Sequence, residues 1–388
     1  MNVIPYGRQN ISEMDIQRVV EVLRSDFITQ GPAVPAFEKG VADYCDAQHA
    51  VAVNSATSAL HIACLAVGVG VGDIVWTSPV SFVASANCAL YCGAAVDFVD
   101  IDPKTYNMSV EALQEKLEKA ERTGKLPKVV IPVDLCGQSC NMAEIHALSK
   151  IYGFKIIEDA SHAIGGLYKN EPVGKGSYSD ITVFSFHPVK IVTTGEGGMA
   201  LTNADNLANR MRLLRSHGIT RDITEMTREP DGPWYYQQIA LGFNYRMTDI
   251  QAALGASQMQ RLDKFVGRRH QIAEEYSRFF SGLPVRIPWQ HPDCYSAFHL
   301  YVILINLPEI RKSRLEVFKT LQQSGIGVSL HYIPIYLQPY YEKLGFKPGY
   351  CPEAEQYYSE AVSLPIFPDM TDEQQDKVMK EMEKALSI

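Results

Sequence analysis

The chain has 388 residues, of which 46% are hydrophobic, so it is long enough to bury a sizeable core and to form two domains. Its net charge of −8 argues against general binding to nucleic acid, which requires a basic surface. No apolar run reaches about 18 residues and the first residues lack the layout of a signal peptide, so we expect a cytoplasmic protein without membrane association.

The N-terminal part of the sequence predicts two helices, one starting at Ser12 and one over residues 35–45. A short buried strand is predicted at 49–53, and the turn after it contains Thr57 and Ser58. Small hydroxyl residues at a strand-to-helix turn either cap the helix or bind an anion at its N-terminus, and the sequence leaves both interpretations open.

Buried strands and amphipathic helices alternate as far as residue 202. Seven strands are predicted, at residues 49–53, 73–77, 95–99, 128–134, 154–158, 181–186 and 198–202. This alternation favours a mainly parallel sheet with helices on both faces. The last strand follows its predecessor after only about a dozen residues, which is too short for a crossover helix, so it could run antiparallel.

Two chemically distinctive side chains follow neighbouring predicted strands. One strand ends in Asp159, with His162 three residues later, and Lys190 lies between the strand at 181–186 and the glycine-rich segment 195–198. A lysine beside glycines is most often a surface residue, but it can also bind a phosphate or attack a carbonyl. A strand-end aspartate about thirty residues earlier favours pyridoxal 5′-phosphate (PLP), with Asp159 facing the pyridinium nitrogen and Lys190 forming the Schiff base.

The remainder of the sequence predicts a smaller α+β region. Residues 220–240 are polar and contain several aromatic residues, which indicates a ligand or partner surface. A long helix is predicted over 250–280, and Asn244 shortly before it could serve as its cap. Further elements are expected at 300–305, 313–325, 327–331 and 371–386.

Eight cysteines are scattered along the chain, at positions 45, 64, 88, 92, 136, 140, 294 and 351. We interpret them as reduced, mostly buried thiols. Two pairs are separated by three residues, which is not a familiar zinc spacing, and His187 has no close carboxylate or second histidine. No metal site is therefore expected.

Four motifs together resemble the DegT/DnrJ/EryC1/StrS family of sugar aminotransferases: residues 158–162, 185–190, 195–198 and 241–250. The resemblance runs from about Pro5 to the C-terminus. It implies an α/β, aspartate-aminotransferase-like fold (PLP fold type I), with a seven-stranded mainly parallel sheet and a smaller α+β C-terminal domain. It also implies a large PLP-binding domain at 26–250, with a small domain and bridging helix formed by 1–25 and 251–388.

The resemblance also implies roles for individual residues. Lys190, Asp159 and His162 would be catalytic, with His162 donating to the phenolic oxygen of the cofactor. The implied cofactor-binding residues are Thr57, Ser58, Phe82, Asp159, His162, Ser185, Lys190 and Asn244. The implied substrate-binding residues are Thr29, Gln30 and His331. Asn244 would reach the phosphate of the neighbouring subunit, which implies a homodimer with shared active sites.

The implied reaction moves an amino group from L-glutamate to C4 of a UDP-linked 4-keto-6-deoxy-N-acetylhexosamine. Segments 27–31 and 232–236 are most similar to family members that act in pseudaminic acid biosynthesis. Two alternatives stay open: another nucleotide-sugar aminotransferase, such as a perosamine-type enzyme using a GDP sugar, and a non-catalytic PLP-binding regulator. Relatives that dehydrate sugars carry histidine in place of the lysine, so Lys190 disfavours dehydration.

Overall fold

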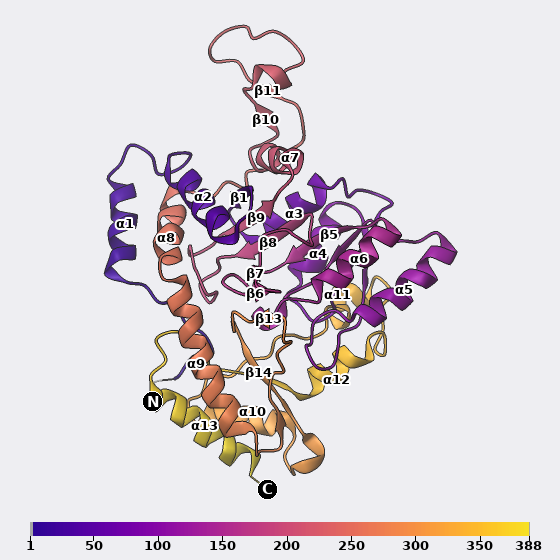
Figure 1. Cartoon of the computed structure of the whole chain (residues 1–388), viewed down its shortest axis with the longest axis vertical. Coiled ribbons are helices and arrows are strands. Elements are labelled where there is room, and N and C mark those ends of the chain that lie inside the picture. The colour runs from indigo at the N-terminus through magenta and orange to yellow at the C-terminus, as the bar shows by residue number, and fades with distance from the viewer. Residues whose placement is uncertain (1–2, 388) are drawn as a thin grey trace.

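A seven-stranded sheet forms the centre of the computed structural model, which describes residues 3–387 (Figure 1). Its strands are β1 (His49–Val53), β2 (Ile74–Thr77), β3 (Ala95–Phe98), β4 (Val129–Ile131), β5 (Lys155–Asp159), β8 (Ile181–Ser185) and β9 (Gly198–Thr202). The spatial order is β1-β9-β8-β5-β4-β2-β3. Strands β3, β2, β4, β5 and β8 are parallel, whereas β9 is antiparallel to both of its neighbours. The predicted sheet and the antiparallel direction of its last strand are confirmed.

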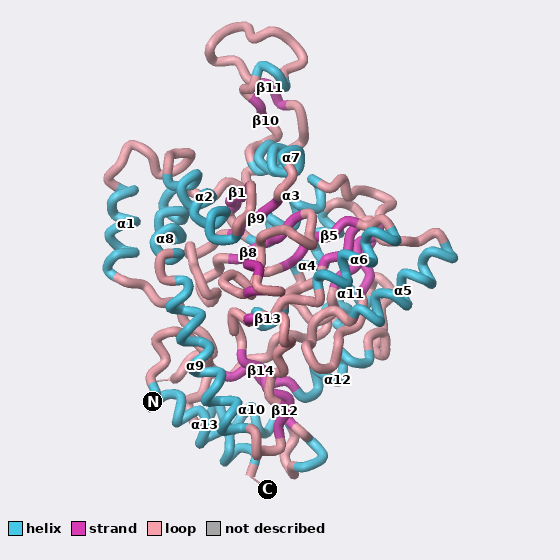
Figure 2. Tube along the Cα trace, viewed as in Figure 1, coloured by secondary structure: helices cyan, strands magenta, loops and turns pink. Residues whose placement is uncertain are grey.

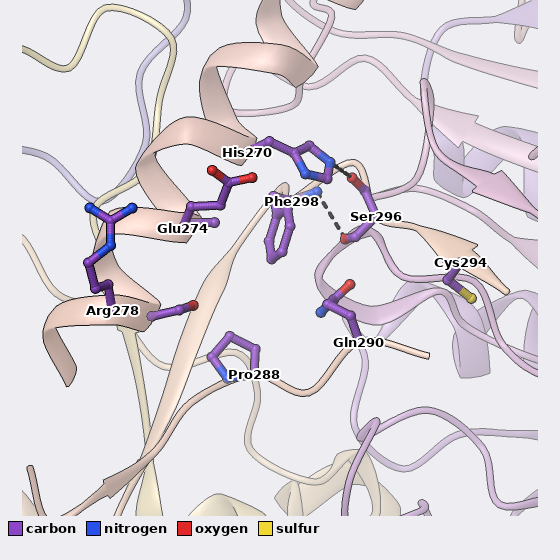
Figure 3. Close-up of a pocket in the computed structure, with 10 residues that line it drawn as sticks. His270, Glu274, Arg278, Pro288, Gln290, Cys294, Ser296 and Phe298 are labelled. Atoms are coloured by element: carbon purple, nitrogen blue, oxygen red, sulfur yellow. Dashed lines mark hydrogen bonds between the residues drawn. The ribbon is translucent and has the colours of Figure 1, made fainter. Parts of the chain in front are cut away.

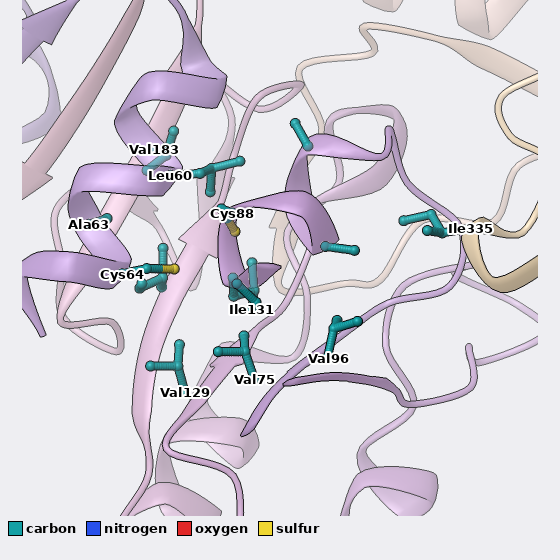
Figure 4. Close-up of a cluster of buried hydrophobic side chains, with 14 of the residues drawn as sticks. Leu60, Ala63, Cys64, Val75, Cys88, Val96, Val129, Ile131, Val183 and Ile335 are labelled. Atoms are coloured by element: carbon teal, nitrogen blue, oxygen red, sulfur yellow. The ribbon is translucent and has the colours of Figure 1, made fainter. Parts of the chain in front are cut away.

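Helices cover both faces of this sheet because side chains alternate along each strand. In β8, Ile181 and Val183 face the core beneath α3 and α4, while Phe184 belongs to the core on the opposite face. Figure 4 shows Leu60 of α3 near Val183 in the first of these cores, with Cys64 one turn further along the helix. The covering helices are α2 (Ala33–Cys45), α3 (Ala56–Ala66), α4 (Ala84–Tyr91), α5 (Val110–Thr123), α6 (Met142–Tyr152) and α7 (Asp205–Arg215).

The C-terminal part has its own antiparallel sheet of β12 (Val285–Arg286), β14 (Tyr301–Ile305) and β15 (Ala361–Leu364). Helices α10 (Arg314–Gln323) and α13 (Asp372–Leu386) contribute to a separate core with β14 and β15. Short elements complete the chain: β6 (Leu167–Tyr168), β7 (Glu171–Pro172), β13 (Cys294–Tyr295), α11 (Pro339–Glu342) and α12 (Pro352–Glu360). The α/β fold with a smaller α+β part is as predicted, while the exact domain bounds at 25–26 and 250–251 remain a prediction.

The prediction of one long helix over 250–280 is wrong in one respect, because two successive helices occupy this stretch. Helix α8 (Asp249–Met259) ends before Gln260, and α9 (Leu262–Phe280) begins after Arg261. The side chain of Arg261 pairs with the buried carboxylate of Asp15, far away in the sequence. Helical periodicity cannot reveal such a contact. The further element expected at 327–331 is not a regular strand in the described chain, where Ser329 forms an isolated bridge with Ser363.

Two apolar surfaces lie open in the single chain. Helix α1 (Glu13–Leu23) starts after Ser12 as predicted, but Ile16 and Leu23 are 47% and 55% exposed. Strands β10 (Ile219–Thr220) and β11 (Gln237–Gln238) form a hairpin that projects from the body of the molecule (Figures 1 and 2). Among residues 3–387, no helix combines the length and apolar character needed to cross a bilayer.

Candidate active site

The two predicted strand-end side chains meet at one edge of the sheet. Strand β5 ends at Asp159, which is in register with Val183 of the parallel neighbour β8. Lys190 lies in the bend after β8, close enough for the Asp159 carboxylate to act on its amine. His162 and His331 lie close enough to the same lysine for its positive charge to lower their pKa values. The structure therefore brings together the three residues predicted to be catalytic and one of those predicted to bind substrate.

Asp159 is held as a buried hydrogen-bond acceptor, with only 4% of its surface exposed. Its Oδ2 accepts a hydrogen bond of 2.6 Å from Ser85 Oγ in α4, and its Oδ1 accepts one of 3.2 Å from the Ser161 amide. The hydroxyl of Ser161 also donates to Oδ1. No local pattern indicated Ser85, because only the packing of α4 on the sheet brings its hydroxyl to this carboxylate.

Lys190 is half-buried beside Asp159, and burial and the carboxylate have opposite effects on the pKa of its amine. Burial lowers the pKa of Lys190 to about 7, while the Asp159 carboxylate raises the pKa of this amine. An amine with this pKa exists in both neutral and protonated forms near neutral pH. It can therefore act as a nucleophile and can accept and return a proton.

The hydrogen bonds of His162 fix which of its nitrogens carries the proton. Nδ1 accepts from the Cys136 amide at 3.3 Å, so a neutral imidazole must be protonated at Nε2, which lies 3.4 Å from the Tyr332 hydroxyl. Burial, and then electrostatic repulsion from Lys190 and from any charge on His331, hold the pKa of His162 well below its usual value. His162 is consequently a neutral N–H donor next to the lysine.

Two further histidines complete this cluster. His331 is buried, with its Nδ1 2.8 Å from Ser363 Oγ, and burial followed by the charge of Lys190 lowers its pKa to about 4. His299, which sequence reasoning missed, has its ring centre 4.4 Å from that of His162. Its Nδ1 is buried and has no hydrogen-bond partner among the described residues. Only a long-range contact places His299 here, so no local sequence signal could have found it.

A cradle suited to an anion lies at the N-terminus of α3. Ser55 caps this helix, and the Ser58 hydroxyl donates a hydrogen bond of 2.6 Å to Asn54 Oδ1. Thr57 is half-buried, and its hydroxyl has no hydrogen-bond partner in the described chain. Ser185 at the end of β8 is in register with Gly198 of β9. A Cβ at Gly198 would lie 2.4 Å from the Ala56 amide nitrogen, so only glycine allows β9 to approach this helix end. Backbone amides and hydroxyls at a helix N-terminus fit a phosphate group.

Phe82, which is predicted to bind the cofactor, lies beside the histidine cluster. The Phe82 ring centre is 6.4 Å from that of Tyr332, and Phe82 is 59% exposed. An exposed aromatic ring beside Tyr332, whose hydroxyl lies 3.4 Å from His162 Nε2, fits a planar ring, as PLP requires.

The remaining predicted residues stay apart from Lys190 within one chain. Thr29 and Gln30 are exposed, and no hydrogen bond among residues 3–387 joins them to the lysine cluster. Asn244 is exposed and pairs through its backbone with Ser216. The possibility that Asn244 caps a helix is wrong, because α8 begins five residues later with Thr248 as its cap.

A pocket of about 550 Å³ lies elsewhere, between α9 and residues 288–298 (Figure 3). Its lining includes His270, Glu274 and Arg278 of α9, and it does not include Lys190. It is therefore separate from the site built on β5 and β8.

A lysine and a buried aspartate at adjacent strand ends, with an anion cradle beside them, fit the site of a PLP-dependent enzyme. The model of the DegT/DnrJ/EryC1/StrS aminotransferase family matches residues 9–383, so the chain belongs to this family. The predicted class of enzyme, its cofactor and its fold are thereby confirmed.

Relatives with names and solved structures are similar over nearly the whole chain. The spore coat polysaccharide biosynthesis protein SpsC of Bacillus subtilis is 40% identical, over 97% of this chain and 95% of its own length. The UDP-4-amino-4,6-dideoxy-N-acetyl-beta-L-altrosamine transaminase of Campylobacter jejuni is 38% identical, over 95% and 93%. Helicobacter pylori PseC, an aminotransferase of pseudaminic acid biosynthesis, is 30% identical with a TM-score of 0.90, over 99% of both chains. The PLP-form of the Streptococcus pneumoniae putative sugar aminotransferase Spr1654 has a TM-score of 0.87 at 28% identity, over 99% and 98%.

Proposed function

We propose that this aminotransferase moves the amino group of L-glutamate to C4 of a UDP-linked 4-keto-6-deoxy-N-acetylhexosamine, in amino-sugar biosynthesis of the pseudaminic acid type. The observation that carries the chemistry is the Lys190 amine beside the buried Asp159 carboxylate, with a neutral His162 N–H next to it. The similarity to the Campylobacter and Helicobacter enzymes supports the choice of sugar. All eight cysteines are free thiols, which supports a cytoplasmic reaction.

When bound, PLP supplies an electron sink for the charge that develops while the amino group is exchanged. Its phosphate would be held by the α3 N-terminus with Thr57, Ser58 and Ser185. Asp159 would face the ring nitrogen, and the exposed face of Phe82 would cover the ring.

Asp159 has to stay ionised to keep the ring nitrogen charged. Ser85 and Ser161 donate hydrogen bonds to its two carboxylate oxygens. The same bonds fix the direction of the carboxylate, so the negative charge is preorganised before any ligand arrives.

Lys190 is the residue in this cluster suited to carry the proton. With its pKa lowered to about 7 by burial, Nζ can take up a proton and return it within one cycle at neutral pH. His162 remains neutral and donates from Nε2, so it orients an oxygen without competing for that proton. His331, whose pKa is lowered to about 4, would likewise meet the sugar as a neutral imidazole.

We also propose a two-fold dimer in which each active site contains residues of both subunits. The apolar residues of α1 and the aromatic hairpin, including Trp234 at 72% exposure, offer the surface that a second copy would cover. Asn244 lies near the base of that hairpin, exposed and not needed as a helix cap. We place it, with Thr29 and Gln30, at the active site of the partner subunit.

The test is turnover of purified protein with L-glutamate and a panel of UDP-, GDP- and dTDP-linked 4-keto-6-deoxy sugars. The proposal expects the N-acetylated UDP sugar to be preferred and 2-oxoglutarate to form in equal amount. Preference for a GDP sugar would instead identify a perosamine-type enzyme. A protein that binds PLP but keeps its visible absorbance band when glutamate is added would be a regulator. Preference for a GDP sugar or an unchanged band would each contradict the proposal.

A further inference from the structure

Asp249 lies in the motif at 241–250, and the proposed reaction assigns it no role. It is the first residue of α8, and its side chain is fully buried. Helix α8 packs against α2, which begins shortly after the predicted substrate-binding residues Thr29 and Gln30 (Figure 1). Since a buried carboxylate is costly unless it is hydrogen-bonded, the partners of Asp249 indicate what it holds in place.

Backbone amides of residues 31–34 donate the hydrogen bonds to this carboxylate. Its Oδ2 accepts a bond of 2.7 Å from Gly31, and its Oδ1 accepts bonds of 2.7 Å and 3.2 Å from Ala33 and Val34. Pro32, at the cap position of α2, provides no side-chain cap, so Oδ1 satisfies the first amides of that helix. The bond from Gly31 to Oδ2 serves a different purpose, because Gly31 lies outside the helix and directly after Gln30.

The backbone at Gln30 has an uncommon conformation that is held from both sides. Its φ of 54° lies in the left-handed region, which residues other than glycine seldom adopt. Before it, the Ile28 carbonyl oxygen accepts a hydrogen bond of 3.0 Å from the Asp249 amide. After it, the Gly31 amide is bonded to the Asp249 carboxylate. Asp249 therefore fixes the chain on both sides of Thr29 and Gln30, and backbone held in this way is typical of functional sites.

Gly31 allows the segment to lie this close to α8. A Cβ at this position would lie 2.4 Å from Phe27 Cβ and 3.3 Å from Asp249 Cγ. The first distance is far below van der Waals contact, so a larger residue would displace the segment from the carboxylate. The side chains of Phe27 and Ile28 are exposed, so the place of the segment depends on its backbone contacts with Asp249.

We infer that Asp249 is a positioning residue for the nucleotide sugar, because it holds the backbone that presents the exposed side chains of Thr29 and Gln30. This inference rests on the proposed function, in which these two residues bind the sugar. A hydroxyl and an amide can each donate and accept hydrogen bonds, which suits the hydroxyl and acetamido groups of an N-acetylated sugar. Such bonds are lost when their atoms separate by about 1 Å more, so a small displacement of the segment is sufficient to weaken binding.

Asp249→Asn separates this role from that of a helix cap. The amide keeps one oxygen, which retains two hydrogen bonds when it faces Ala33 and Val34 and only one when it faces Gly31. The cap of α2 is therefore kept, and an N–H group points at the Gly31 amide. We expect the KM for UDP-linked 4-keto-6-deoxy-N-acetylhexosamine to rise about tenfold, with the half-reaction with glutamate within about twofold of the wild type.

Gly31→Ala is a second variant, which displaces the same segment without altering α8 and should raise the sugar KM in the same way. Gly40→Ala is its matched control, because a Cβ at this position in α2 meets nothing within 4 Å. Thr371→Ala controls for a loss of stability, because Thr371 caps α13 in the C-terminal part of the molecule. Thermal unfolding measures stability, and both controls should keep the wild-type sugar KM.

A mutant cycle then tests whether Asp249 acts through the two side chains. The double variant Thr29→Val with Gln30→Ala removes their hydrogen-bonding groups and should raise the sugar KM, and adding Asp249→Asn to it should raise KM no further. Additive effects on KM, or a wild-type KM in Asp249→Asn and Gly31→Ala, would overturn the inference while leaving the proposed function intact. A wild-type enzyme that aminates no nucleotide-linked keto-sugar would instead contradict the proposed function itself, and this inference with it.

Discussion

Replacing Gly198 with alanine tests how tightly the phosphate cradle is built. A methyl group there would lie 2.4 Å from the Ala56 nitrogen, 2.5 Å from the Ser55 carbonyl carbon and 2.6 Å from the Ala56 Cα. All three atoms belong to the backbone, so no side chain can rotate away, and β9 and α3 must separate by about 1 Å to restore van der Waals distance. Overpacking of this kind costs about 1–3 kcal/mol, and backbone neighbours put Gly198→Ala near the upper end of that range.

The same displacement moves the α3 N-terminus away from Ser185, so cofactor binding should weaken by about tenfold or more, equivalent to at least about 1.4 kcal/mol. Urea unfolding of the apoenzyme measures the stability loss, and spectroscopic titration with PLP measures the affinity. Gly40→Ala is the matched control, because a Cβ there meets nothing within 4 Å and it lies inside α2, where alanine is preferred to glycine. Wild-type stability and cofactor affinity in Gly198→Ala would refute the close approach of β9 to the helix.

Three further predictions concern the lysine and its neighbours. Asp159→Asn keeps the shape of the side chain but removes the anion, so the half-reaction with glutamate should slow by about a hundredfold or more in stopped-flow absorbance; a near-normal rate would exclude the proposed role. In the apoenzyme, acylation of Lys190 should be half-maximal near pH 7, because the neutral amine reacts and burial lowers its pKa to about 7. Since the Asp159 carboxylate favours the protonated amine, Asp159→Asn should move that midpoint to lower pH; an upward shift would reverse the assigned electrostatics. Lys190→Ala and Asn244→Ala chains, each impaired alone, should regain activity when co-refolded, since a mixed dimer contains one complete site; verified mixed dimers without activity would reject the shared-site model.

Local patterns in the sequence were sufficient for the parts of the site that lie on strand ends. The buried runs before Asp159 and Lys190 predicted two adjacent parallel strands, and parallel strands bring their carboxyl ends to one edge. The same reasoning predicted the antiparallel β9, because the segment before it is too short for a crossover.

Long-range contacts were beyond such patterns. The break between α8 and α9 coincides with the pairing of Arg261 with Asp15, and the carboxylate of Asp249 accepts hydrogen bonds from the Gly31 and Ala33 amides at 2.7 Å. Neither contact has a local signature. For the same reason His299 and Ser85, which lie at the site through packing alone, could not be found from the sequence.

The position of the covalent link between enzyme and cofactor tests the central claim most directly. Borohydride reduction of the PLP-loaded enzyme, followed by peptide mass spectrometry, should place the pyridoxyl group on Lys190, and Lys190→Ala should carry no label and show no turnover with glutamate and keto-sugar. Label on a different lysine, or full turnover by Lys190→Ala, would contradict the assignment of the active site to the strand ends of β5 and β8.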